Sequence, residues 1–272
     1  MSKTRIIDMK QINKGYMLGT ERVPVLKDVD FQVEKGEFVA ILGPSGSGKT
    51  TLMNIIGCMD VADSGEYYLD EQPIHDMAEK KMGTIRNKEI GFIFQNYQLI
   101  PTYDILQNII MPLVVRGMTT KEAEEKCFPV IEMLGIGHRL RHKPSELSGG
   151  QKQRFTIILV MMQNAELTFY DEVTSGLDFE TRQKLVEKLA EWYQGKETSF
   201  LMVSHYYEEL DQLADKLLIL DKGRVIDYGR REELFRKYCG RAVIIVGNTE
   251  KNMTLMSDFG KLASPAHLIA MS

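Results

Sequence analysis

Residues 38–50 of this 272-residue chain read FVAILGPSGSGKT, a short apolar run that passes directly into a glycine-rich turn. The apolar run at 38–42 is typical of a buried parallel strand. Residues 43–50 fit the pattern G-x-x-x-x-G-K-[ST], and residues 51–56, TLMNII, continue with a helical composition. A strand before the glycines and a helix after them form the context that this phosphate-binding motif requires. The sequence therefore predicts a strand, a phosphate loop and a helix.

The residue types of this loop suit a polyphosphate. Glycines let backbone N–H groups curl around phosphate oxygens, and the start of the following helix adds partial positive charge. Lys49 supplies a point charge for the outer phosphates, and the hydroxyl of Thr50 can ligate Mg²⁺. The alternative is a glycine-rich turn without a ligand. The candidate nucleotide-binding residues of the loop are Gly43, Pro44, Ser45, Gly46, Ser47, Gly48, Lys49, Thr50 and Thr51.

Two adjacent carboxylates, Asp171 and Glu172, follow the apolar run at 167–170. The carboxyl ends of strands form the ligand-binding edge of an open α/β sheet. There Asp171 can hold Mg²⁺, directly or through water, and Glu172 can take a proton from an attacking water. An acidic pair alone is more often a surface turn, but a phosphate loop in the same chain favours a site.

The remaining pattern indicates a parallel α/β sheet, since apolar runs alternate with helical segments. We expect buried strands at 167–170, 200–203 and 217–220, helices at 122–134, 179–193 and 232–238, a hairpin turn at 221–223 and one more strand at 241–246. The first 35 or so residues, with 67–73, predict an antiparallel portion. Residues from about 96 to 163 predict a helical insert.

Composition excludes several classes of protein. A net charge of −4 provides no broad basic field, so nucleic acid is not an expected partner. Three widely spaced cysteines without a C-x-x-C pair argue against a disulfide or zinc scaffold and suit a reducing compartment. No stretch approaches the roughly 18 to 20 apolar residues of a spanning helix, and the start of the chain lacks the apolar region of a signal peptide.

Residues 147–151 read LSGGQ, and with this string the sequence resembles the ATP-binding-cassette (ABC) ATPases. The other family motifs follow in the expected order. Gln95 looks like the Q-loop residue, Ser-Gly-Leu-Asp at 175–178 like the D-loop, and His205 like the switch histidine. Tyr16 looks like the aromatic residue that stacks on adenine. The resemblance covers roughly residues 5–230, and its strength lies in the joint order of motifs that are weak one by one.

The resemblance implies roles for these residues. It places Glu172, His205, Gln95 and Lys49 in catalysis, Thr50, Gln95 and Asp171 at Mg²⁺, and Tyr16 with residues 43–51 against ATP. In this family the signature of one subunit faces the phosphate loop of another, so two chains sandwich each ATP. Ser148, Gly149, Gly150, Gln151 and Asp178 would therefore act in trans on the nucleotide of a second ATPase subunit, in a homodimer or a heterodimer.

The fold implied is a P-loop NTPase with an antiparallel β subdomain and a helical subdomain that carries the signature. We expect an ATP-binding domain at 1–240, its helical subdomain at about 96–163, and an extension of unknown role at 241–272. Residues 90–118 are similar to the branch of macrolide exporters, lipoprotein-releasing ATPases and antimicrobial-peptide transporters. That implies a cytoplasmic ATPase, peripheral on the inner face of the cell membrane, which powers export of a peptide, lipoprotein or drug-like cargo, or mechanotransmission, through a membrane permease.

Two departures from the family pattern lie outside the catalytic set. Leu159 stands where an arginine is usual, and Val173 replaces the proline that commonly follows the catalytic glutamate. We expect a working ATPase, slowed if either substitution matters. Two rival functions stay open at this point. One is a soluble cassette protein of translation or DNA repair, and the other is a regulatory cassette that binds ATP without hydrolysing it.

Overall fold

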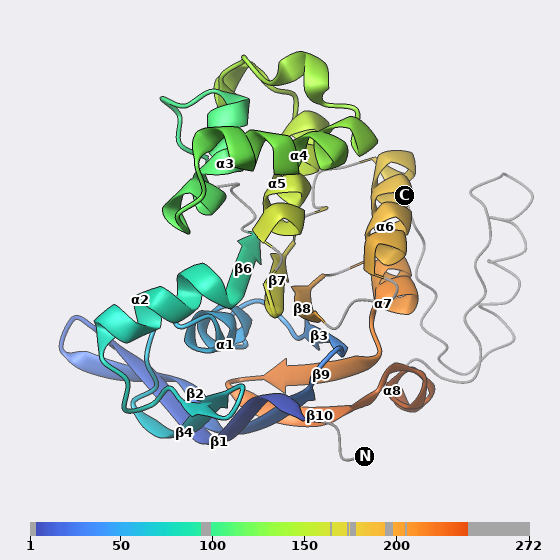
Figure 1. Ribbon diagram of the computed structural model, residues 1–272. Coiled ribbons are helices and arrows are strands. Elements are labelled where there is room, and N and C mark those ends of the chain that lie inside the picture. The colour runs from blue at the N-terminus through green and yellow to red at the C-terminus, as the bar shows by residue number, and fades with distance from the viewer. Residues whose placement is uncertain are drawn as a thin grey trace, which may run out of the picture.

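The computed structural model describes residues 4–93, 99–163, 165–172, 174, 178–193, 198–204 and 206–238. Within these residues the chain forms two sheets and eight α-helices (Figure 1). Gln95, Val173, residues 175–177, His205, Cys239 and the predicted strand at 241–246 lie outside the described residues.

The larger sheet has the strand order β10-β9-β3-β8-β7-β6. Its strands are β3 (Phe38–Leu42), β6 (Ile90–Ile93), β7 (Leu167–Asp171), β8 (Ser199–Val203), β9 (Lys216–Asp221) and β10 (Arg224–Arg230). All neighbours are parallel except β9 and β10, which form an antiparallel hairpin around Lys222 and Gly223. Both turn residues have positive φ, at 46° and 82°, as a tight two-residue hairpin requires. The strands predicted at 38–42, 167–170, 200–203 and 217–220 are confirmed, and so is the hairpin turn at 221–223.

The smaller sheet is antiparallel, as expected, with the order β2-β1-β4-β5. It contains β1 (Arg5–Leu18), β2 (Glu21–Glu34), β4 (Ser64–Leu69) and β5 (Gln72–Pro73). The pairing of β1 with β4 ends at Asn13 and Ser64, while β1 continues beside β2 to Leu18. The C-terminal end of β1 therefore extends beyond β4.

Two helices lie near the antiparallel strands, α1 (Lys49–Ile56) and α2 (Glu79–Lys88) (Figure 1). Between β6 and β7 come α3 (Ile105–Val115), α4 (Thr120–Met133) and α5 (Gly149–Gln163), which gather at one end of the molecule (Figure 1). Later in the chain are α6 (Phe179–Tyr193), α7 (Tyr207–Leu213) and α8 (Arg231–Tyr238). Short 3₁₀ turns, η1 (Gly137–Arg139) and η2 (Pro144–Glu146), precede α5.

Reciprocal caps explain why two of these helices begin where they do. The side chain of Asp104 accepts a hydrogen bond from the backbone N–H of Gln107 at the start of α3, and the side chain of Gln107 accepts one from the backbone N–H of Asp104. Thr119 and Glu122 do the same for α4. Such a capping box satisfies two backbone N–H groups that the first turn leaves without partners. Because of its cap, α4 starts two residues before the predicted segment 122–134.

The larger sheet lies between two apolar layers. Phe38 and Ala40 of β3 belong to one buried cluster, which includes side chains of α3–α6, whereas Val39 and Ile41 belong to the other, shared with α1 and the antiparallel sheet. This alternation is what a strand buried on both faces shows. Leu159, at the position of the family arginine, packs against the first cluster. An apolar contact therefore stands where the family usually has an arginine.

Candidate functional site

The phosphate loop connects the carboxyl end of β3 to the start of α1. Gly43, Gly46 and Gly48 have φ angles of 153°, 76° and 105°, a region that L side chains rarely adopt. A Cβ on Gly43 would lie 2.1 Å from the carbonyl oxygen of Leu220, so no other residue fits there. A Cβ on Gly46 would meet no atom of the described chain within 4 Å. The loop is therefore packed against β9 at its base and open at Gly46.

Lys49 and Ser47 fill the inside of the loop. The Nζ of Lys49 donates to the carbonyl oxygens of Gly43 at 2.8 Å and Pro44 at 3.0 Å, which holds the charge over the loop. The buried Oγ of Ser47 has no hydrogen-bond partner among the described residues. Native proteins rarely leave such an atom unpaired. An open glycine, a held ammonium and an unpaired hydroxyl together fit the oxygens of a polyphosphate.

The acidic pair lies at the end of β7. Asp171 is the last residue of the strand, and Glu172 turns away from it with a φ of 49°, its backbone N–H donating to the carbonyl of Val203 at 3.0 Å. Burial raises the pKa of Asp171, and so does the charge of Glu172, while Lys49 is close enough to offset part of the effect. Two carboxylates in a partly buried position need a cation. β3 and β7 both pair in parallel with β8, so the phosphate loop and the acidic pair follow strand ends at the same edge of the sheet.

The residues present also fit a magnesium ion bound with the nucleotide. Thr50 is exposed in the first turn of α1, and Asp171 is the last residue of β7, which β8 separates from β3. Mg²⁺ in phosphate-transfer sites is usually held by one or two protein oxygens together with the phosphates themselves. Gln95, the third predicted ligand, lies outside the described residues.

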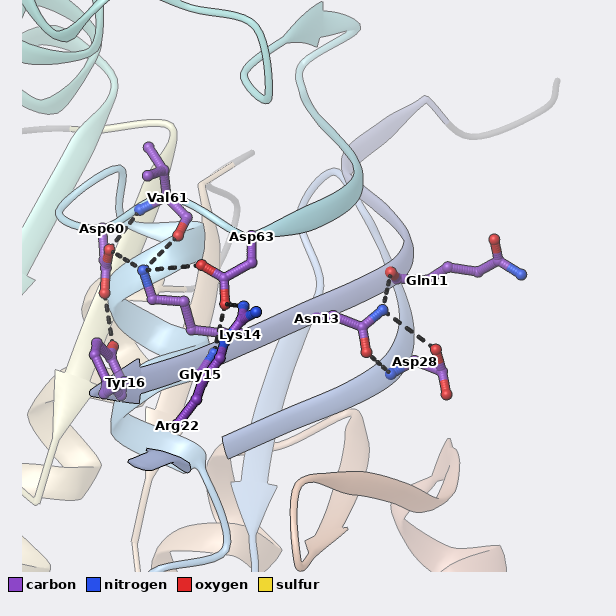
Figure 2. Close-up of polar contacts among 10 residues, drawn as sticks. All are labelled: Gln11, Asn13, Lys14, Gly15, Tyr16, Arg22, Asp28, Asp60, Val61 and Asp63. Atoms are coloured by element: carbon purple, nitrogen blue, oxygen red, sulfur yellow. Dashed lines mark hydrogen bonds and ion pairs between the residues drawn. The ribbon is translucent and has the colours of Figure 1, made fainter. Parts of the chain in front are cut away.

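Tyr16 lies near the end of β1, two residues before Leu18. The residue is 39% exposed. Its hydroxyl donates to Asp60 at 2.6 Å (Figure 2). It also interacts with Thr51 of α1, two residues after Lys49. The structure thus brings the predicted base-stacking residue to the helix that begins at the loop, although residues 16 and 51 are far apart in the sequence.

The signature and D-loop residues lie at two other helix starts. Gln151 and Ser148 cap α5 reciprocally: the backbone N–H of Ser148 donates to Oε1 of Gln151 at 3.0 Å, and that of Gln151 donates to Oγ of Ser148 at 3.4 Å. Gly149 and Gly150 form the first turn. Asp178 is exposed and accepts a hydrogen bond from the N–H of Thr181 at 2.9 Å, at the start of α6. None of these described residues shares a helix with the phosphate loop.

Sequence reasoning missed a buried acidic residue behind the site. Glu209 of α7 is 1% exposed and accepts hydrogen bonds from the hydroxyls of Thr174 and Ser204. Thr174 is two residues beyond Glu172, and Ser204 directly precedes His205 in the sequence. Glu209 itself gave no signal, because Glu208 and Glu209 together read as the acidic first turn of a helix.

Sequence reasoning also missed the polar cluster around Tyr16. Lys14, Asp60 and Asp63 join the end of β1 to the turn that follows α1 (Figure 2). A lysine two residues before the aromatic carries no local signal of such a role. Only the folded chain shows which carboxylates it meets.

Comparison with protein families matches residues 26–175 to the ABC transporter model. The chain is similar to the lipoprotein-releasing system ATP-binding protein LolD of Pseudomonas syringae pv. tomato, with 36% identity over 84% of this chain and 100% of that protein. It is also similar to LolD of Saccharophagus degradans, with 37% identity over 74% of this chain and 89% of the relative. A third relative is the uncharacterized ABC transporter ATP-binding protein YknY of Bacillus subtilis, 35% identical over 81% of this chain and 95% of that protein.

Among solved structures, the chain is similar to the ATP-binding cassette MJ0796, determined as a dimer in a post-hydrolysis state with ADP and Pi. The two superpose with a TM-score of 0.77 and 31% identity, over 87% of this chain and 100% of the other. In the described part of this chain, none of the helices combines the length and apolar character that crossing a bilayer demands.

Proposed function

The chain belongs to the ABC transporter family as an ATP-binding and ATP-hydrolysing subunit, and on that premise we propose that it powers export or mechanotransmission through a separate membrane permease. The observation that carries the catalytic part of the proposal is the convergence of the phosphate loop with the acidic end of β7. Ile41 at the end of β3 and Asp171 at the end of β7 both pair with Val203 of β8, so the loop and the acidic pair leave the same edge of the sheet. One site thus holds groups for phosphate, for metal and for a proton.

We propose that Glu172 acts as the general base. Its positive φ breaks the extended backbone of β7 directly after Asp171, and of the two carboxylates one would serve the metal and the other the attacking water. Bound Mg²⁺ would neutralise charge on the β- and γ-phosphates. Lys49, with the N–H groups of the loop, holds those oxygens. His205 and Gln95 would complete the site, by holding the γ-phosphate and the metal.

A second copy of the ATPase subunit, or a related chain, completes the mechanism that we propose. Ser148, Gly149, Gly150 and Gln151 lie at the start of α5, among α3 and α4, whereas the phosphate loop precedes α1 (Figure 1). An N–H-rich helix start with a serine cap is a second anion site. Two phosphate sites in separate parts of one chain are used together if two chains face each other, and the solved cassette MJ0796 is a dimer. Asp178, at the start of α6, would cross the same interface.

The cargo that we propose is a peptide, a lipoprotein or a drug-like molecule. The support is the similarity to LolD, which is by name part of a lipoprotein-releasing system. The permease would supply the membrane-spanning part, and this chain would sit on the cytoplasmic face of the membrane. Replacing Gln95 or deleting residues 96–102 should abolish transport more than ATP binding, and unchanged transport in both variants would exclude coupling through this segment.

The catalytic part is tested by ATP hydrolysis in the presence and absence of Mg²⁺. We expect Lys49→Ala and Asp171→Asn each to lower kcat by at least about a hundredfold, the scale at which removing charge stabilisation from a transition state is felt. Lys184→Ala is the matched control, because Lys184 is exposed on α6 and pairs only with Glu180 among the ion pairs of the described residues. Full activity of either site variant would refute the assignment.

A further inference from the structure

Three consecutive residues of β1 are tied to the turn that follows α1. Lys14 and Tyr16 use their side chains, and Gly15 uses its backbone N–H (Figure 2). The carboxylates of Asp60 and Asp63 in the turn accept these hydrogen bonds. The register of β1 against β2 shifts on both sides of Lys14, so this stretch does not follow a regular ladder. Side chains of the turn therefore fix the backbone where the ladder is irregular.

Asp63 takes the place of a missing strand neighbour. The ladder between β1 and β4 ends at Asn13 and Ser64, and from there the carboxylate of Asp63 accepts from the N–H of Gly15 at 2.6 Å. The same oxygen accepts from Nη2 of Arg22 on β2 at 2.6 Å. Asp63 thereby holds the backbone one residue before the tyrosine.

Asp60 holds the tyrosine itself. One of its oxygens accepts from the hydroxyl of Tyr16 at 2.6 Å, and the other accepts from Nζ of Lys14, also at 2.6 Å. Lys14 is only 9% exposed and donates a further bond to the carbonyl of Val61 at 2.7 Å. Partial burial would raise the pKa of Asp60, but the hydrogen bonds from Lys14 and Tyr16 outweigh it and lower the pKa overall. Asp60 is thus a charged acceptor held in place from two sides.

The ring of Tyr16 remains available despite these contacts. Tyr16 is 39% exposed as a residue, and Nζ of Lys14 lies 5.0 Å from the centroid of its ring. The hydrogen bond from the Tyr16 hydroxyl to the fixed carboxylate of Asp60 restricts the orientation of the ring. An aromatic platform that is oriented before its ligand arrives loses less entropy on binding. Asp60 is also four residues beyond the end of α1, so the helix that starts at the phosphate loop sets the position of the ring.

We propose that Asp60, held by Lys14, is the positioning residue for Tyr16 and sets the affinity of the site for the base of the nucleotide, not for its phosphates. This inference rests on the proposed role of Tyr16 as the surface on which adenine stacks. Asp60 would not touch the nucleotide. Its effect would pass entirely through the ring that it orients.

The test compares two ligands that differ in the base. The affinities of ATP and of inorganic triphosphate, each with Mg²⁺, are measured by calorimetry for the wild type and Asp60→Asn, and the kinetics of ATP hydrolysis are measured beside them. Loss of a hydrogen bond to a charged group predicts that ATP binds about tenfold more weakly. We expect the affinity for triphosphate to be unchanged, and KM for ATP to rise with little change in kcat.

A double-mutant cycle separates positioning from general loosening of the fold. In a Tyr16→Ala background, Asp60→Asn should have no further effect on ATP affinity, because the ring it positions is gone. Tyr16→Phe, which keeps the ring and loses the hydroxyl, should reproduce the effect of Asp60→Asn. Asp28→Asn is the control. Asp28 of β2 accepts a hydrogen bond at 3.2 Å from Asn13, which lies on the same strand as Tyr16, but Asp28 has no described contact with Tyr16 itself (Figure 2). ATP affinity should therefore be unchanged in this variant.

Two results would overturn the inference. Equal weakening of ATP and triphosphate in Asp60→Asn would show that the carboxylate supports the fold of the loop instead, and undiminished ATP affinity would show that the ring needs no support. Failure of the proposed function looks different, since the wild type itself would then neither bind triphosphate nor hydrolyse ATP.

Discussion

Replacing Glu209 by alanine removes a carboxylate on which two buried hydroxyl groups depend. Ser204 donates to Oε2 at 2.5 Å and Thr174 donates to Oε1, while all three residues are at most 3% exposed. Burial raises the pKa of Glu209, and the hydrogen bonds from Ser204 and Thr174 with the charge of Arg182 offset part of that rise. The carboxylate is therefore costly to bury and yet needed by its neighbours.

The expected loss of stability follows from these opposing effects. Each buried hydroxyl left without an acceptor costs about 1–3 kcal/mol. Burying the carboxylate itself costs free energy, because the hydrogen bonds offset only part of its desolvation. Removing it therefore recovers some of the stability that the hydroxyls lose. We therefore expect Glu209→Ala to lower the free energy of unfolding by about 2 kcal/mol. With a urea m-value of about 2 kcal/mol per molar, the unfolding midpoint would fall by roughly 1 M.

Urea denaturation followed by circular dichroism measures this shift, and Glu208→Ala is the matched control. Both glutamates lie in the first turn of α7, so both variants lose the same favourable charge near the helix start. Oε2 of Glu208 is buried without a hydrogen-bond partner in the described chain, so its removal leaves no donor unsatisfied there. Equal midpoints for the two variants would refute the reasoning.

Two further predictions concern the loop glycines and the buried thiols. Gly43→Ala should prevent stable folding because its Cβ would meet Leu220 O at 2.1 Å, whereas Gly46→Ala should cost only the roughly 1–2 kcal/mol of a left-handed backbone; equal melting temperatures would contradict this. Burial raises the pKa of Cys58 to about 12 and that of Cys127 to about 11, so at pH 8 both thiols are protonated, and their reactive thiolate fraction grows only as the pH rises toward those values. Iodoacetamide at pH 8 should therefore leave both thiols unlabelled in the native protein and label both in urea, as measured by mass spectrometry. Rapid labelling of either thiol in the native protein would contradict this prediction.

The parts of the fold that local patterns encode were predictable from the sequence. The apolar run at 38–42 followed by GPSGSGKT specifies a strand, a turn and a helix within 20 residues, and the structure has β3 and α1 there. Its helix begins at Lys49, before the predicted segment 51–56, because Gly48 serves as the N-cap. Local composition fixes the type of an element better than its ends.

The support around the site was not predictable, because long-range pairing creates it. Lys14 and Asp60 are 46 residues apart, and Glu209 meets Thr174 across 35 residues. Neither pair lies within one helix or strand, so no periodicity reports it. The roles of Gln95 and His205 stay predictions, as do the domain limits at 240 and 241, because those residues lie outside the described part of the chain.

The most direct test of the account compares the wild type with Glu172→Gln in ATP and Mg²⁺. Glu172→Gln keeps the shape of the side chain and removes the proposed base. The measurement is phosphate release together with oligomeric state by size-exclusion chromatography with light scattering. The account predicts that the wild type hydrolyses ATP and that the variant accumulates as an ATP-bound dimer. Wild-type turnover in the variant, or a monomer that binds no ATP, would contradict the proposed two-chain mechanism.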